Sequence, residues 1–138
     1  DRVAFTDSYS YRMGIPKEAL AAIYTAMDVL LQPSRGEGFG IPSAEAQATG
    51  TPVVVSNATA QPELVGDGWL CEVQPAWDVA QGCWFFTPLV PSIVDNLEAA
   101  YARGRRRSQQ AIDFAANYDA DVVFDKYWRP ALDILLAP

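Results

Sequence analysis

The sequence predicts an α/β fold, a doubly wound parallel sheet with a helical tail at one end. Short runs rich in β-branched residues alternate with segments of helical periodicity, and this alternation is typical of strand–helix–strand units. Residues 28–32 are apolar almost throughout, as in strands that a parallel sheet buries on both faces. The glycine-rich residues 35–40 lie between this strand and a helix, an arrangement found where open parallel sheets bind ligands.

The first quarter of the chain predicts one short strand and one helix. Residues 3–6 form a strand candidate, and the polar stretch from there to Gly14 predicts a loop. The helix begins near Pro16, because proline is favoured in a first helical turn. Its buried face is predicted from four side chains at three- and four-residue spacing: Leu20, Ile23, Tyr24 and Met27.

After the glycine-rich turn, the sequence predicts a second helix and two more strands. Pro42 favours the first turn of this helix, which runs through Ala48 and is stopped by Gly50. Strands are predicted at residues 52–56 and 69–73, with one helical turn between them at residues 62–65. Residues 74–88 are aromatic and lack a clear period, so they predict an irregular segment in which 83–86 is a candidate short strand.

Residues 1–138 are expected to form a single partial domain. From about residue 90 to residue 138 the pattern predicts a helical tail. One helix begins at Ser92 and a second ends at Ala116. A third is capped by Asp119 or Asp121 and should bend at Pro130, which has no N–H to donate. The apolar faces of the first and third helices are Ile93, Leu97, Ala100 and Tyr101, and Val123, Tyr127, Leu132 and Leu135.

Composition limits the classes of function. The 138 residues include ten Lys plus Arg, seventeen Asp plus Glu and no His, for a formal charge of −7 at pH 7. This acidic balance argues against nucleic acid or an anionic membrane surface as the main partner. Without His, triad-type nucleophilic catalysis and imidazole base chemistry are excluded within this chain. No apolar run approaches the ~20 residues that span a bilayer, so no transmembrane segment is predicted.

Three other features have competing interpretations. Cys71 and Cys83 are best read as buried thiols of a cytoplasmic protein, with a disulfide between them as the alternative. The arginines of residues 103–107 could form a patch that binds nucleic acid or lipid head groups, but solvated cations that compensate a helix dipole are the favoured interpretation. The aromatic group Trp77, Trp84, Phe85 and Phe86 could stack on a sugar or an acceptor, but a core or domain-contact role is favoured.

The glycine-rich turn carries the most informative chemistry. Gly38 and Gly40 allow a ligand to approach the backbone, and the free N–H groups from Ile41 onward favour a phosphate. Glu37 and Glu45 add two acceptor carboxylates, eight residues apart. Amides that cradle an anion beside carboxylates that accept from hydroxyls suit a nucleotide sugar. Carboxylates that are merely exposed on the surface are the alternative.

Residues 29–73 resemble the donor-binding domain of family 4 retaining glycosyltransferases, which have the GT-B fold of two Rossmann-like domains. The resemblance rests on an ordered, gap-free series of motifs: Pro33-Ser34, Glu37-Gly38-Phe39-Gly40-Ile41-Pro42, Glu45-Ala46, Gly50-Thr51-Pro52-Val53-Val54, Ser56-Asn57 and Pro62-Glu63-Leu64-Val65. It implies that the chain is an incomplete C-terminal half of such an enzyme.

The resemblance also implies roles for six residues. Glu37 would be the catalytic residue, held against the hydroxyls of the transferred sugar, and Glu45 would bind the ribose hydroxyls. The remaining donor contacts, made through the backbone to sugar and diphosphate, would come from Gly38, Phe39, Gly40 and Ile41. The implied reaction is hexosyl transfer from a nucleotide-diphosphate sugar with retention of configuration, and it requires no metal and no other cofactor.

The sequence departs from the family pattern at several positions. The family often has Met and Cys where this sequence has Gln47 and Thr49, and we interpret these two differences as packing variants. Where the family commonly has two glycines, this sequence has Ala58-Thr59-Ala60. The resemblance implies that the N-terminal acceptor domain and two cationic diphosphate ligands lie outside this chain. The acceptor stays unidentified, and the exposed half-cleft could form a homodimer. The alternative function is a stand-alone or degenerate nucleotide- or sugar-binding module without transferase activity.

Overall fold

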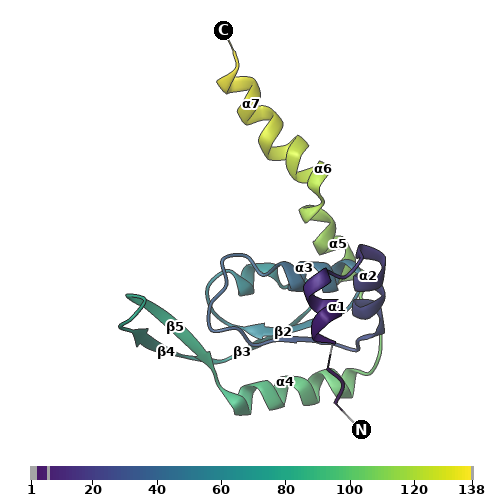
Figure 1. Cartoon of the computed structure of the whole chain (residues 1–138), viewed down its shortest axis with the longest axis vertical. Coiled ribbons are helices and arrows are strands. Elements are labelled where there is room, and N and C mark those ends of the chain that lie inside the picture. Colours follow the sequence, from purple (N-terminus) through teal and green to yellow (C-terminus); the bar gives the residue numbers. More distant parts are fainter. Residues whose placement is uncertain (1–2, 6, 138) are drawn as a thin grey trace.

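The structure is a computed structural model that describes residues 3–5 and 7–137. Its core is a parallel sheet covered on both faces by helices (Figure 1). Its strands are β1 (Leu30–Gln32), β2 (Val53–Ser56) and β3 (Gly68–Cys71), in the order β1-β2-β3. Leu30 lies opposite Val53, and Val53 lies opposite Gly68. In Figure 1, α3 (Ile41–Ala48) covers one face and α4 (Val90–Arg103) the other, which confirms the predicted doubly wound α/β architecture.

The central strand is the most deeply buried element. Val53, Val54 and Val55 have no exposed surface, as expected for a β-branched run covered on both sides. Burial of each such side chain stabilises the fold by about 1.5–3 kcal/mol. Tyr24 and Ala46 pack against this strand from α2 (Lys17–Ala26) and α3, so the core lies between the sheet and these helices.

The amino-terminal segment differs from its prediction. Residues 3–5 form no strand, because they have no neighbouring strand with which to pair, and Thr6 lies outside the described residues. The predicted loop before Gly14 contains instead the short helix α1 (Ser8–Met13). The predicted helix after Pro16 is confirmed as α2, in which Tyr24 is buried and Ile23 is 39% exposed. The buried face of α2 is therefore narrower than the spacing of its apolar side chains predicts.

The aromatic segment after β3 is a two-stranded antiparallel hairpin, so the prediction of an irregular segment is wrong. Its strands are β4 (Val73–Asp78) and β5 (Cys83–Pro88), and the latter includes the predicted strand 83–86. The turn forms because the Asp78 carboxylate accepts from the Gln81 N–H at 2.9 Å and Gly82 takes a positive φ of 62°. In Figure 1 the hairpin extends away from the main sheet.

The carboxyl-terminal helices leave the sheet region. After α5 (Gln109–Ala115) and the short turn η2 (Ala116–Tyr118) come α6 (Ala120–Val123), the π-helical turn η3 (Phe124–Trp128) and α7 (Arg129–Leu135). The π-helical turn accommodates Pro130: the Arg129 N–H bonds the Phe124 carbonyl five residues back. In Figure 1, α6 and α7 follow nearly one line, so the predicted bend at Pro130 is not formed. The apolar face predicted for this helix is largely exposed, with Leu135 at 78%.

The arginine cluster has mostly structural partners. Arg105 and Arg107 donate to the carbonyls of Thr25 and Ala26 at the carboxyl end of α2, which supports the favoured dipole-compensating interpretation. Arg103 instead forms a bidentate pair with Asp67, at 2.7 and 2.6 Å, and joins α4 to the residue before β3. The Arg103 hydrogen bonds hold the pKa of Asp67 below its ordinary value.

We expect Asp67→Asn to lower the free energy of unfolding at pH 7 by about 1–3 kcal/mol, because the partly buried Arg103 loses its charged partner. The folded-state pKa of Asp67 is depressed, so the pair stabilises the fold above the unfolded carboxyl pKa near 3.8 and loses this effect as pH falls through the folded value. Urea denaturation should therefore show a difference at pH 7 that shrinks below pH 4. The control, Asp125→Asn, breaks an exposed pair with Arg129 and should cost at most about 0.5 kcal/mol. A pH-independent difference would contradict the prediction.

Candidate functional site

The candidate site lies where β1 ends and α3 begins, at the carboxyl edge of the sheet. Gly40 is the N-cap of α3 and has a left-handed φ of 102°. Residues other than glycine adopt this backbone conformation only at a cost in free energy. Because Gly40 has no side chain, no side-chain oxygen caps the helix. Pro42 has no N–H and the Ser43 N–H donates to the Gly40 carbonyl at 3.0 Å, so within the described residues the Ile41 N–H is the first-turn donor left for another acceptor. A Cβ atom at Gly38 would meet no atom within 4 Å. Packing within the fold therefore does not require glycine at residue 38. Close approach of a ligand to the backbone would require it, because a side chain would occupy that space.

Glu37 is held in place by a network of polar side chains. Its Oε1 accepts from Ser34 Oγ at 2.7 Å and from Gln32 Nε2 at 3.2 Å. Its backbone N–H donates to Thr59 Oγ1 at 3.0 Å, and the Gln32 amide oxygen accepts from Ser43 Oγ at 2.8 Å. Within the described residues Oε2 makes no hydrogen bond, so the network fixes the carboxylate and leaves one oxygen for a ligand.

Glu45 has a buried phenol as its partner. The Tyr24 hydroxyl donates to Glu45 Oε2 at 3.0 Å. Burial, followed by the hydrogen bond and the charge of Glu45, raises the pKa of Tyr24 to about 12, so the phenol keeps its proton at neutral pH. The apolar spacing of α2 identified Tyr24 as a core residue but did not indicate its contact with a carboxylate 21 residues further along the chain. The polar end of a Tyr ring on the border of the core was the available signal.

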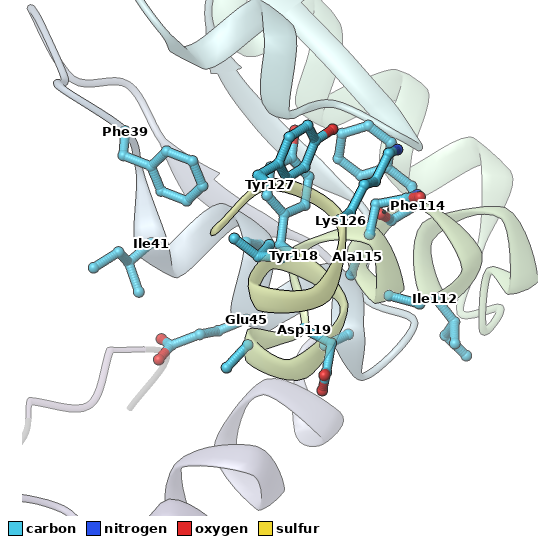
Figure 2. Close-up of a pocket in the computed structure, with 16 residues that line it drawn as sticks. Phe39, Ile41, Glu45, Ile112, Phe114, Ala115, Tyr118, Asp119, Lys126 and Tyr127 are labelled. Atoms are coloured by element: carbon cyan, nitrogen blue, oxygen red, sulfur yellow. Dashed lines mark hydrogen bonds between the residues drawn. The ribbon is translucent and has the colours of Figure 1, made fainter. Parts of the chain in front are cut away.

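A groove of about 1020 Å³ adjoins Glu45 (Figure 2). Phe39, Ile41 and Glu45 follow one side of it, and residues of α5, η2, α6 and η3 follow the other, including Tyr118 and Tyr127. The rings of Phe39 and Tyr118 meet edge to face with centroids 5.5 Å apart. The groove thus brings three of the six predicted site residues together. The other three, Glu37, Gly38 and Gly40, do not line it.

The described residues offer neither a metal-binding cluster nor a membrane-spanning helix. Among the residues that the structure describes, no group of three or more His, Cys, Asp or Glu side chains could hold a metal ion. In that part of the chain, no helix combines the length and the apolar character that a bilayer crossing requires. Cys71 and Cys83 are free thiols, so the disulfide alternative is not formed. The metal-independent reaction stays a prediction.

Comparison with known proteins identifies the family. Residues 1–84 match the family described as Glycosyl transferases group 1, and these residues include the glycine-rich turn, Glu37 and Glu45. The chain belongs to this family. The resemblance that the motifs indicated is thereby confirmed at the level of the family. The division of donor contacts among the site residues of this group 1 glycosyltransferase chain stays a prediction.

Several curated group 1 relatives are similar over most of the chain. The D-inositol 3-phosphate glycosyltransferase of Mycolicibacterium smegmatis is 29% identical over 96% of the chain and 29% of its own length. The corresponding enzyme of Streptomyces avermitilis is 39% identical over 91% of the chain and 26% of its own length. The MMP alpha-(1->4)-mannosyltransferase of Mycolicibacterium hassiacum is 37% identical over 73% of the chain and 25% of its own length. The matched region therefore covers between 25% and 29% of these relatives.

Proposed function

We propose that this chain is the donor-binding part of a glycosyltransferase that transfers a sugar from a nucleotide-diphosphate sugar to an acceptor with retention of configuration. The observation that carries the proposal is the fixed Glu37 carboxylate, held by Ser34 and Gln32 directly before the uncapped amino end of α3. An immobilised acceptor beside the free Ile41 N–H and the positive end of a helix dipole matches a ligand that carries both hydroxyls and phosphates.

The arrangement suggests a position for each part of the donor. The diphosphate would lie at the amino end of α3, where the free Ile41 N–H and the helix dipole favour negative charge. Glu37 Oε2 would accept from hydroxyls of the transferred sugar. Glu45, oriented by Tyr24 at the border of the groove, would accept from the ribose hydroxyls.

The proposed mechanism is electrostatic. The bond between the sugar C1 and the diphosphate oxygen breaks, and the acceptor oxygen forms its bond to C1 on the same face of the ring. The acceptor proton passes to an oxygen of the departing diphosphate, so no side-chain base is needed. The amides of α3 stabilise the charge that develops on the diphosphate, and Glu37 orients the sugar. No metal or other cofactor takes part.

The acceptor and the rest of the cleft would come from outside this chain, in the GT-B arrangement that the motif resemblance implies. The name of one relative, a mannosyltransferase, supports a hexose as the transferred group. The free thiols suit a reducing compartment such as the cytoplasm.

Donor binding tests the proposal. Titration calorimetry with a panel of uridine and guanosine diphosphate sugars should show binding of one member, and Glu45→Gln should weaken it by about tenfold or more, because a charged acceptor of the ribose hydroxyls is lost. Glu63→Gln, an exposed carboxylate in η1 (Gln61–Leu64), is the matched control and should leave the affinity unchanged. Equal effects of the two substitutions, or no binding of any nucleotide sugar, would contradict the proposal. A transfer assay with the complete enzyme then separates a transferase from a binding module.

A further inference from the structure

Thr59 has an unusual backbone conformation. Its φ of 55° lies in the left-handed region, and among the described residues it is the only residue other than glycine with a positive φ. This conformation is costly for an L-residue, and most of all for a β-branched one, whose side chain crowds the backbone. Thr59 lies between β2 and η1, in a loop at the carboxyl edge of the parallel sheet.

Packing does not account for threonine at this position. Thr59 is exposed to solvent, so its side chain fills no part of the core. Within the described residues, its side chain makes one hydrogen bond: Oγ1 accepts from the Glu37 N–H at 3.0 Å. Strained backbone conformations concentrate at functional sites, where the strain serves a purpose other than packing. The strained conformation of Thr59 therefore directs attention to its contact with Glu37.

The contact with Thr59 restrains a segment of backbone that has no other anchor. Glu37 lies between Gly36 and Gly38, and glycine allows the chain the widest range of conformations. Within the described residues, the bond to Thr59 is the only hydrogen bond that the backbone of residues 36–39 makes. Loss of this bond would free the Cα atom from which the Glu37 side chain extends.

Glu37 is thus held at both of its ends. Ser34 and Gln32 hold one oxygen of its carboxylate, and Thr59 holds its backbone N–H from a different loop. The position of the remaining oxygen, Oε2, depends on both anchors. A small misplacement of a group that acts on the transition state is costly in rate, because its orientation is part of the catalytic effect.

We propose that Thr59 is a positioning residue of the transferase, whose hydroxyl anchors the backbone of Glu37 so that Oε2 meets the transferred sugar in the transition state. This role rests on the proposed function, which assigns Glu37 to that sugar. The cost of a left-handed threonine is accepted at this position because a glycine would offer no hydroxyl to the Glu37 N–H.

Thr59→Val and Thr59→Ser test the hydroxyl. Valine keeps the branched shape but cannot accept from the Glu37 N–H, so the turnover number of the complete enzyme should fall about tenfold, while the dissociation constant of the donor stays within about threefold. Serine keeps the hydroxyl and should retain turnover within about twofold. Thr87→Val, at an exposed residue on β5, is the matched control and should turn over as the unaltered enzyme does. In the Glu37→Gln background, Thr59→Val should have less than about a twofold further effect, because the charge that it positions is already absent.

Thr59→Gly separates positioning from stability. Glycine also lacks the hydroxyl, so turnover should fall at least as far as it does in Thr59→Val. Glycine adopts a positive φ without strain, however, so Thr59→Gly should unfold at a higher urea concentration than Thr59→Val. If Thr59 only stabilised the fold, activity would follow stability and the glycine variant would be the more active of the two.

Amide hydrogen exchange tests the anchor without any reaction. In the 138-residue chain, the Glu37 N–H should exchange about tenfold faster in Thr59→Val than in the unaltered protein, and Thr59→Ser should keep the exchange slow.

Three results would overturn the role of Thr59: equal exchange of the Glu37 N–H in the unaltered and valine proteins, a higher turnover of the glycine variant than of the valine variant, or a rise in the donor dissociation constant as large as the loss of turnover. If hydrogen exchange shows the anchor but the complete enzyme transfers no sugar, the proposed function fails and the anchor of Glu37 stands.

Discussion

Glu37→Gln is expected to lower the turnover number of the complete enzyme by about 10²–10³-fold, while the dissociation constant of the donor changes by no more than about threefold. The substitution keeps the shape of the side chain and its contacts with Ser34 and Gln32 but removes the negative charge. That charge matters most when positive charge develops on the sugar, so the loss falls on the transition state rather than on the ground state.

Steady-state kinetics and donor titration on the same preparation separate these effects. The matched control is Glu98→Gln, an exposed carboxylate on α4, which should keep wild-type turnover. An increase in the Michaelis constant with unchanged turnover would show that Glu37 only binds the ground state, and would refute its catalytic role.

Gln47→Ala is expected to lower the free energy of unfolding by about 3–5 kcal/mol, a large part of the 5–15 kcal/mol typical of a domain. Gln47 is fully buried in α3, and its amide joins three elements. Its Nε2 donates to the carbonyls of Ser43 at 2.9 Å and Leu64 at 2.7 Å. Its Oε1 accepts from the N–H groups of Gly66 at 2.7 Å and Asp67 at 3.1 Å. Alanine removes the partner of the buried Leu64 carbonyl and of the partly buried N–H groups of Gly66 and Asp67, and it creates a cavity.

Urea denaturation measures this loss, and Gln47→Met separates its two causes. Methionine fills the volume but makes none of the hydrogen bonds, so it should still cost about 2–3 kcal/mol. A methionine variant as stable as the unaltered protein would support the packing interpretation that the family pattern suggested. The exposed Gln109→Ala serves as control, and its effect should stay within about 0.5 kcal/mol.

Local patterns predicted the elements whose burial is decided within a few residues. The apolar run before Pro33 became β1, the β-branched run at Val53 became the buried centre of the sheet, and Pro42 began α3. Each of these signals acts within one turn or one strand, so it does not depend on which distant segment packs against it. The motif series identified the family for the same reason, since its residues are contiguous.

The sequence by itself therefore determined the parallel α/β core and the place of the glycine-rich turn at its carboxyl edge. Only the tertiary structure decided that residues 73–78 and 83–88 pair as a hairpin and that Tyr24 reaches Glu45. It also decided that Phe39 meets Tyr118, which lies 79 residues later in the sequence, across one groove. These contacts join segments with no local periodicity in common. They form because buried polar groups must find partners and apolar faces must be covered, and both requirements are met by whichever elements the completed fold brings into reach.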